Sequence, residues 1–166
     1  RSTQSRSSAA SDVYKRQIVM NLVHIPSSNL DDVWNLVKKD ISEALAYSGN
    51  HTNADFVYDV LKKETMQLWV VWDKDKPTAL EKYYGVVVTE IVERKLKKSC
   101  NIFIVTGRHR QKWQHLISVI EDFALDNQCS NMELIARKGW EKIMEQFNYK
   151  RTHVVLEKSI TQKGNK

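Results

Sequence analysis

The sequence predicts an α/β protein. Short runs of β-branched and aromatic residues are typical of strands. They alternate with stretches whose apolar residues recur at three- and four-residue spacing, as on one face of a helix. The expected order of elements is β-α-α-β-β-β-α-β-α-β. The chain has 166 residues, of which 42% are hydrophobic and 28% charged, and these values are typical of a single globular domain.

Residues 1–19 differ in composition from the rest of the chain. They are rich in Ser, Arg and Gln, and they lack the uninterrupted apolar stretch of a secretory signal. The segment SSAASDVYKRQ resembles a translated sequencing adapter or vector tail, so we expect the native chain to begin at Met20. A disordered basic arm is the alternative. Four cations and Asp12 give residues 1–19 a net charge of +3, which leaves +3 of the total +6 for the remaining 147 residues. Such a modest charge makes nucleic acid an unlikely partner.

Residues 20–160 are expected to form one domain, followed by a disordered tail at residues 161–166. The predicted strands are residues 21–25, 66–73, 83–93, 100–106, 132–136 and 151–157. The apolar stripes that predict helices run through residues 30–45, 56–61, 113–124 and 140–147. Ser28 is the predicted N-cap of the first helix and Asn53 that of the second.

The strand CNIFIVT, residues 100–106, is nearly uniformly apolar and suits a sheet centre covered on both faces. Cys100 and Cys129 lack metal-ligand spacing and flank apolar stretches, which predicts buried free thiols and a cytoplasmic location. The five histidines have no paired metal spacing, so no metal is expected. No stretch approaches the roughly 18 apolar residues that cross a bilayer.

The densest charge cluster of the chain consists of Arg94, Lys95, Lys97 and Lys98. It falls between two predicted strands, so a solvated hairpin turn is the default interpretation. Nucleic-acid binding through the basic turns is a weaker possibility, and it predicts an affinity that falls steeply with salt.

The order of elements resembles that of the GNAT superfamily of N-acetyltransferases over essentially all of residues 20–160. In that family a central strand runs into a phosphate-binding turn at the start of a long helix, and a strand, a short helix and a C-terminal strand come after it. Here CNIFIVT looks like the central strand, GRHRQKWQHL like the turn, and GWEKIMEQFNYKRTHVVLEK like the last helix and strand. The resemblance implies a mixed, strongly twisted sheet with helices on both faces, whose two central strands splay apart.

The resemblance also implies acetyl-CoA as the acyl donor, bound in the gap between those strands, with no metal. Its pantetheine amides would pair with the backbone of the central strand, and its pyrophosphate would lie on the turn after that strand. The cofactor-binding candidates are therefore Ile104, Val105, Thr106, Arg108, Arg110, Gln111, Lys112 and Trp113.

The turn departs from the family's pattern, which is an Arg or Gln followed by glycines at offsets three and five and a leucine at offset eight. With Arg108 first, Leu116 occupies the leucine position, but Gln111 and Trp113 replace the glycines. Their side chains would crowd the close backbone approach that glycine permits. The amides of a helix N-terminus would still be available to an anion.

The cations in this turn suggest a bound anion. Arg108, Arg110 and Lys112 crowd the first turn of the predicted helix, where positive charge opposes the helix dipole. A phosphate-bearing ligand, coenzyme A first among candidates, would offset that cost. A solvated basic turn and nucleic-acid phosphate are the alternatives.

The groups that would move protons are sparse. The family's general acid is a tyrosine five residues before the aromatic that opens the last strand. Counting back from Tyr149 gives Met144, which has no proton to donate. Glu90 is the candidate base, because it alternates with Val86 and Val88 on one strand face and an apolar environment would raise its pKa. A solvated carboxylate beside the basic turn is the alternative.

The sequence therefore favours an acyl-CoA-dependent N-acyltransferase that transfers acetyl to an amine of unknown identity, by direct attack in a ternary complex. The lost glycines and tyrosine favour instead a non-catalytic GNAT-like binding or assembly module. Compact, degenerate versions of this fold occur among tailed-phage structural and accessory proteins, which would place the chain in a host cytoplasm or a virion. The sequence leaves both functions open. The expected partners are an acyl-CoA and an amine acceptor, without a membrane.

Overall fold

The computed structural model describes residues 20–48 and 51–161. The expected leader over residues 1–19 lies outside these residues, as does most of the expected tail. The described chain falls into two compact units, the first ending at Ile135 and the second beginning at Ala136.

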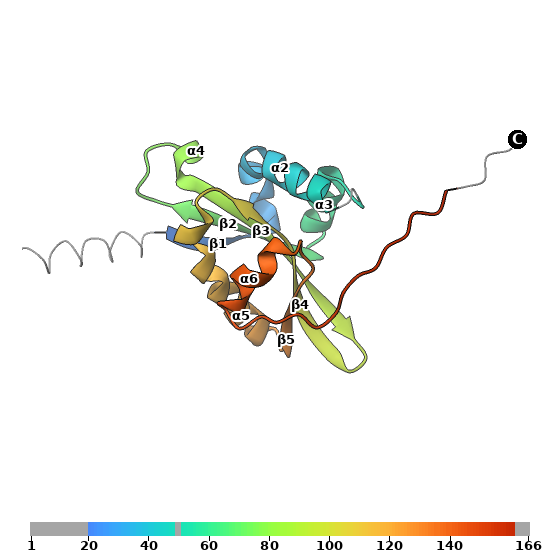
Figure 1. The fold of residues 1–166 in the computed structure, drawn as a ribbon. Coiled ribbons are helices and arrows are strands. Elements are labelled where there is room, and N and C mark those ends of the chain that lie inside the picture. Colours follow the sequence, from blue (N-terminus) through green and yellow to red (C-terminus); the bar gives the residue numbers. More distant parts are fainter. Residues whose placement is uncertain (1–19, 49–50, 162–166) are drawn as a thin grey trace, which may run out of the picture. The chain divides into compact units, whose positions relative to one another are not determined.

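The first unit is built on a five-stranded sheet in the order β1-β2-β3-β4-β5 (Figure 1). All neighbouring strands are antiparallel except β4 and β5, which are parallel, so the prediction of a mixed sheet is confirmed. The strands are β1 (Met20–Ile25), β2 (Met66–Asp73), β3 (Tyr83–Arg94), β4 (Lys97–Gly107) and β5 (Asn131–Leu134). The helices of this unit are α2 (Leu30–Tyr47), α3 (Ala54–Lys62), α4 (Ala79–Lys82) and α5 (Ile117–Asp126), with 3-10 turns η1 (Ser27–Asn29), η2 (Arg110–Lys112) and η3 (Gln114–Leu116).

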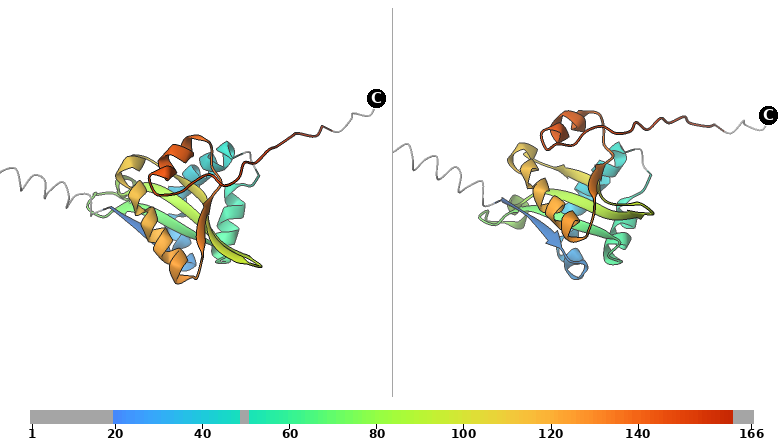
Figure 2. Two further views of the ribbon diagram at one scale, coloured as in Figure 1. Left: turned by 60° about the horizontal axis from the view of Figure 1, so that its bottom comes forward. Right: turned by 90° about the horizontal axis from the view of Figure 1, so that it is seen from below.

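Helices cover both faces of this sheet, as predicted (Figure 2). Because side chains alternate along a strand, β2, β3 and β4 each contribute to two separate cores. On the face covered by α2 and α3, which we call the α2 face, the core includes Leu68, Val70, Val86, Val88 and Ile104. On the face covered by α5, the α5 face, it includes Leu22, Trp69, Val71, Val87 and Ile102.

The starts of the first two helices differ in how well the sequence predicted them. Asn53 is the N-cap of α3, and its side chain accepts a hydrogen bond from the Phe56 amide at 2.9 Å, as predicted. The prediction of Ser28 as the N-cap of α2 is wrong, because Ser28 lies inside η1. Pro26 initiates that 3-10 turn by accepting the Asn29 amide at 2.9 Å, which moves the start of the α-helix to Leu30.

The predicted helix from residue 113 begins later, at Ile117. Residues 110–116 form η2 and η3, separated by Trp113 with φ −131°. The Trp113 ring is buried against Gly85 of β3, and its Nε1 donates to the Arg108 carbonyl at 2.8 Å. The irregular start of this helix therefore follows from burial of the tryptophan.

The β3–β4 hairpin is longer than predicted. β3 runs to Arg94 and β4 starts at Lys97, so only Lys95 and Leu96 form the turn. The basic segment is therefore mostly strand, and its side chains have defined faces.

The second unit contains α6 (Gly139–Glu145), in which Met144 is buried. The predicted strand over residues 151–157 is not formed, and residues 151–161 are exposed without regular structure. An isolated strand cannot satisfy its own backbone hydrogen bonds. The second unit has no other strand among its described residues, so alternating apolar residues alone do not produce one here.

Candidate functional site

The edge of β4 that faces β5 is only partly paired. Parallel pairing runs from Ser99↔Asn131 to Ile102↔Leu134. β4 continues for residues 103–107, where β3 is its only partner strand among the described residues. The pairing of β4 with β5 therefore stops part-way along β4, as two central strands that splay apart would require. Within the described part of the chain, no strand pairs with Ile104, Val105 and Thr106 on the β5 side.

A β-bulge lies where the pairing with β5 ends. Val88 pairs with Ile104 but Thr89 pairs with Ile102, so Phe103 has no Cα partner in β3. A bulge bends its strand and increases the local twist. It therefore explains locally why β4 leaves β5 at this point.

The turn after β4 is shaped by close approach to β3. Gly107 has φ 153°, and a Cβ there would lie 2.3 Å from the Tyr84 carbonyl oxygen. His109, two residues after Gly107, has a left-handed backbone conformation with φ 52°. η2 uses the amides of Lys112 and Trp113, which donate to the carbonyls of His109 and Arg110 at 2.9 and 3.0 Å.

Four cofactor-binding candidates lie in this turn besides Trp113. The two hydrogen bonds of η2 involve the amides of Lys112 and Trp113 and do not involve the amide of Gln111. The side chains of Gln111 and Lys112 are exposed, while Arg110 is half-buried and donates from Nε to Gln114 at 3.3 Å. Lys112 is therefore the cation that is best placed to contact a ligand from solvent.

Arg108 has structural partners. Its Nε donates to the Tyr83 carbonyl at 3.1 Å, and its Nη2 donates to the carbonyls of Glu81 and Leu80 at 2.9 and 3.3 Å. Its guanidinium carbon also lies 4.5 Å from the centre of the Tyr84 ring. Arg108 therefore caps the C-terminal carbonyls of α4. An anion at this guanidinium would compete with those bonds.

Trp113 occupies the core of the α5 face. Its ring lies against Gly85 of β3, on the side of β4 opposite to β5. It helps to line an apolar cavity of about 20 Å³, together with residues of β1, β3, β4 and α5. Trp113 therefore supports the turn from beneath, and its ring packs away from the β5 side of β4.

A second cluster lies on the α2 face, where β3, β4 and β5 carry polar residues. We call it the polar patch, and it comprises Glu90, Arg94, Lys97, Ser99, Asn101, Asn131 and Glu133. The register places Glu90, Asn101 and Glu133 side by side across the three strands, and Ser99 beside Asn131.

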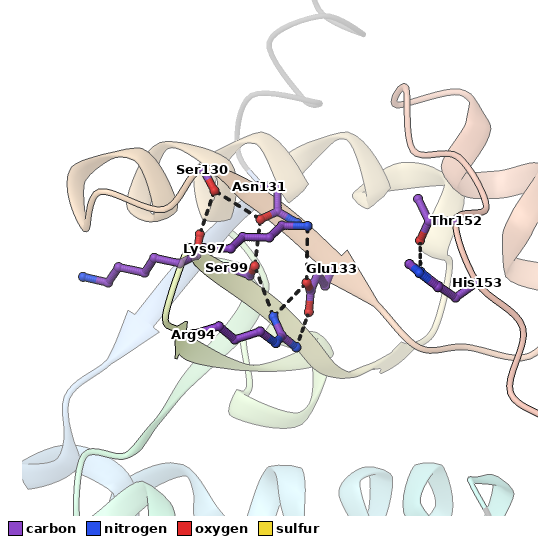
Figure 3. Close-up of polar contacts among 9 residues, drawn as sticks. Arg94, Lys97, Ser99, Ser130, Asn131, Glu133, Thr152 and His153 are labelled. Carbon is purple, nitrogen blue, oxygen red and sulfur yellow. Dashed lines mark hydrogen bonds and ion pairs between the residues drawn. The ribbon is translucent and has the colours of Figure 1, made fainter.

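Ion pairs and hydrogen bonds organise one end of the polar patch (Figure 3). Arg94 binds both carboxylate oxygens of Glu133, at 3.0 and 3.2 Å, and Lys97 Nζ lies 4.0 Å from the same carboxylate. Ser99 is fully buried and donates to the Asn131 Oδ1 at 2.7 Å. Burial raises the pKa of Glu133, but the two hydrogen bonds from Arg94 and the Arg94 charge contribute to the opposite effect, and the pKa lies below its ordinary value.

Glu90 and Asn101 form the other end. Glu90 is half-buried and pairs with Met66 of β2 as well as with Asn101, so the sheet is still continuous at this carboxylate. Val86 and Val88 lie in the core of the same face, as the alternation predicted. The Oδ1 of Asn101 is buried and accepts no hydrogen bond from the described residues. A buried acceptor without a donor is rare in native proteins and calls for an explanation.

Glu90 was predicted from the sequence as a site residue, whereas Asn101 and Glu133 were not. A signal for both was present, because each is a single polar residue within an apolar run, in CNIFI and MELI. Their alignment with Glu90 depends on strand register. The described residues contain no group of three or more metal-ligating side chains, and among them no helix has the length and apolarity of a membrane span.

Several solved structures with the same architecture are named as acetyltransferases. A probable acetyltransferase superposes with a TM-score of 0.63 at 11% identity, over 87% of this chain and 99% of that one. The fold is that of the GNAT acetyltransferases. An aminoglycoside acetyltransferase from an uncultured soil metagenomic sample, in complex with sisomicin, has a TM-score of 0.60 at 12% identity, over 86% and 97% of the two chains.

An acetyltransferase that is named for a protein substrate is also similar. The ribosomal-protein-alanine N-acetyltransferase from Brucella melitensis biovar Abortus 2308 has a TM-score of 0.55 at 12% identity, over 87% of this chain and 99% of that one. No protein-family model matches the sequence, and no curated protein matches it. At these identities the similarity establishes the GNAT fold.

Proposed function

We propose that this protein is an acyl-CoA-dependent N-acyltransferase that transfers acetyl to an amine by direct attack in a ternary complex. The observation that carries the proposal is the combination on β4 of an open backbone edge over residues 103–107 with the polar patch that begins at Asn101. A donor and an acceptor could thus meet on one strand. The GNAT fold of the chain supports the same function.

The residues of the turn and of β4 fit an acyl-CoA. Backbone groups of Ile104, Val105 and Thr106 would pair with its pantetheine amides, as a strand neighbour would. The amide of Gln111 and the side chain of Lys112 would hold the pyrophosphate, because an ammonium and a backbone N–H group both favour anions. When bound, acetyl-CoA supplies a thioester whose carbonyl an amine can attack.

Two residues of the polar patch would serve the acceptor. Glu90 would remove a proton from the attacking ammonium, since amines attack only when neutral. The Asn101 Oδ1, which has no donor among the described residues, would accept a hydrogen bond from the amine and orient it after a small side-chain rotation. Asn101 lies two residues before the segment 103–107 of β4, and Glu90 is its Cα partner in β3.

One arrangement favours the alternative of a non-catalytic binding module. Arg108 is engaged by α4 carbonyls, and the position of the family's tyrosine is the buried Met144. The departing thiol, with a pKa near 8.5 in model compounds, can leave as a thiolate without a general acid, so catalysis does not require that tyrosine.

Titration of acetyl-CoA into the full chain by calorimetry tests the donor site. Binding is expected to weaken roughly 10-fold in Lys112→Ala, the loss typical of one charge-assisted contact. The control Lys38→Ala removes an exposed cation of α2 and is expected to leave the affinity unchanged. An absence of heat at millimolar acetyl-CoA would discard the enzyme hypothesis.

Acetyl transfer to a panel of primary amines tests the catalytic role. Glu90→Gln is expected to lower kcat by about 10²–10⁴-fold, as loss of a general base does, with the dissociation constant of acetyl-CoA unchanged. Binding of acetyl-CoA without any turnover by the unmodified protein would favour the binding module.

A further inference from the structure

The α2 face carries opposite charges at its two ends. Glu90 lies on β3 next to the core, and Arg94 lies four residues further along the same face, paired in register with Lys97. At a rise of about 3.3 Å per residue, roughly 13 Å of strand separates the carboxylate from these cations. The charge of the polar patch therefore changes along β3, from negative beside the core to positive at the hairpin tip.

The basic end retains positive charge after its internal ion pairs are counted. On the α2 face Arg94 and Lys97 share the single carboxylate of Glu133, and Lys95 adds a further cation at the turn. Three cations against one anion leave a net charge of +2. Glu93 and Lys98 face each other on the opposite side of the hairpin, so their charges cancel there.

The Arg94 guanidinium and the hairpin backbone are held in place. Besides the two bonds from Arg94 to Glu133, the backbone amide and hydroxyl of Ser130 both donate to the Lys98 carbonyl, at 2.8 and 3.2 Å. The hairpin is thus tied to β5 at its base (Figure 3). A ligand would meet an Arg94 charge that is already positioned, together with the Leu96 side chain at the tip, which is 96% exposed.

We infer that the acceptor is an acidic peptide, whose reactive amine lies at Glu90 and whose Asp or Glu side chains come about four residues later. This inference rests on the proposed function. An extended peptide advances about 3.3–3.6 Å per residue, so four residues span the same roughly 13 Å as the patch. Leu96 would contact an apolar side chain of the peptide. Polycationic amines would be repelled by the net charge of the hairpin.

Three peptides of equal length test the inference. Each carries a free N-terminal amine and a fluorophore at the C-terminus, with Glu, Gln or Lys at the fourth and fifth positions. Acetyl transfer gives kcat/KM, and fluorescence anisotropy gives the dissociation constant without acetyl-CoA. The Glu peptide is expected to bind at least 10-fold more tightly than the Gln peptide, and this preference should shrink as ionic strength rises.

Substitutions within the hairpin locate the effect. Lys95→Gln and Lys97→Gln are each expected to reduce the preference for the Glu peptide about 3-fold, and together about 10-fold. Lys98→Gln, which removes the same charge from the opposite face, is the matched control and should leave the preference unchanged. Circular dichroism and thermal unfolding of each variant verify that the fold is intact.

The outcomes separate this inference from the proposed function. Equal binding of the Glu and Gln peptides, or no binding of either, overturns the inference even if other amines are acetylated. An equal effect of Lys98→Gln overturns the assignment to the α2 face. Tight, charge-dependent binding of the Glu peptide without acetyl transfer supports the surface and rejects the enzyme.

Discussion

On the α2 face, the same strands carry two very different regions. Next to α2 and α3, the side chains of Val86, Val88 and Ile104 are between 0 and 4% exposed. A few residues away, Glu90 and Asn101 are half-buried, and Arg94 at the hairpin tip is exposed. Backbone pairing is continuous between the two regions in β3 and β4, except for the bulge at Phe103.

We expect the apolar region of the α2 face to determine stability and the polar patch to determine binding. The apolar region stabilises the fold by burying side chains, at about 25 cal/mol per Å² of apolar surface. The polar patch buries less and keeps a buried acceptor atom without a partner among the described residues. We therefore expect substitutions in the first region to unfold the protein, and substitutions in the second to change what it binds.

The largest effect is expected in the apolar region. Ile104→Ala should lower the free energy of unfolding by about 2–5 kcal/mol, because it removes a buried side chain and leaves a cavity. Urea denaturation monitored by circular dichroism measures the change. Leu96→Ala, at the exposed hairpin tip, is the control and should change it by less than about 0.5 kcal/mol. Similar losses in the two variants would contradict the assignment of the core.

The next effect tests the junction of β3 with the turn. Gly85→Ala would place a Cβ 2.8 Å from the Thr106 carbonyl oxygen and 2.9 Å from the Trp113 ring. Overpacking of this kind typically costs about 1–3 kcal/mol, and displacement of Trp113 should also weaken acetyl-CoA binding. Gly139→Ala has no atom within 4 Å of the added Cβ and is the control for both measurements. An unchanged stability in Gly85→Ala would show that the ring does not pack on β3.

A smaller effect depends on pH and lies in the polar patch. The pKa of Glu133 is below its ordinary value, so the carboxylate stabilises the fold above about pH 4.5, and this stabilisation is lost as pH falls through the lowered pKa. Glu133→Gln should cost about 1 kcal/mol at pH 7, and the difference should shrink as the pH falls below the ordinary carboxyl pKa. Urea denaturation across this pH range measures it. Glu43→Gln is the control, because the Glu43 carboxylate is exposed and lies 3.9 Å from Lys39 Nζ. A difference at Glu133 that does not depend on pH would refute the ion pair.

The smallest effect on stability is expected at Asn101. Asn101→Ala removes an acceptor that has no donor among the described residues, so the free energy of unfolding should change by no more than about 0.5 kcal/mol. Acetyl transfer should fall nevertheless, mainly through a higher KM for the amine. A large loss of stability would show that Asn101 has a structural partner in the folded protein.

The predictability of each element depends on how local its determinants are. The strand over residues 66–73 was predicted at its observed bounds, because the β-branched and aromatic run ends at the polar turn after Asp73. Asn53 was predicted correctly because a cap contacts an amide only three residues away. The delayed start of α5 was missed, since it depends on Trp113 packing against Gly85, 28 positions away in the sequence.

In the candidate site, too, the residues that depend on local sequence were predicted and the contacts between distant residues were not. The order of elements indicated the turn after β4 and the backbone of residues 104–106, and alternation along β3 indicated Glu90. The sequence predicted that Arg108 binds an anion. It did not predict α4, so the hydrogen bonds from the Arg108 guanidinium to the α4 carbonyls were missed.

The sequence by itself determined which segments form strands and helices, which of their faces are apolar, and where the chain resembles the GNAT family. Only the tertiary structure decided that Glu90, Asn101 and Glu133 lie side by side and that β4 leaves β5 after Ile102. The physical reason is that periodicity and capping act over a few residues of one chain segment. Register and bulges arise from hydrogen bonds between strands far apart in the sequence, so their outcome appears only when the sheet is assembled.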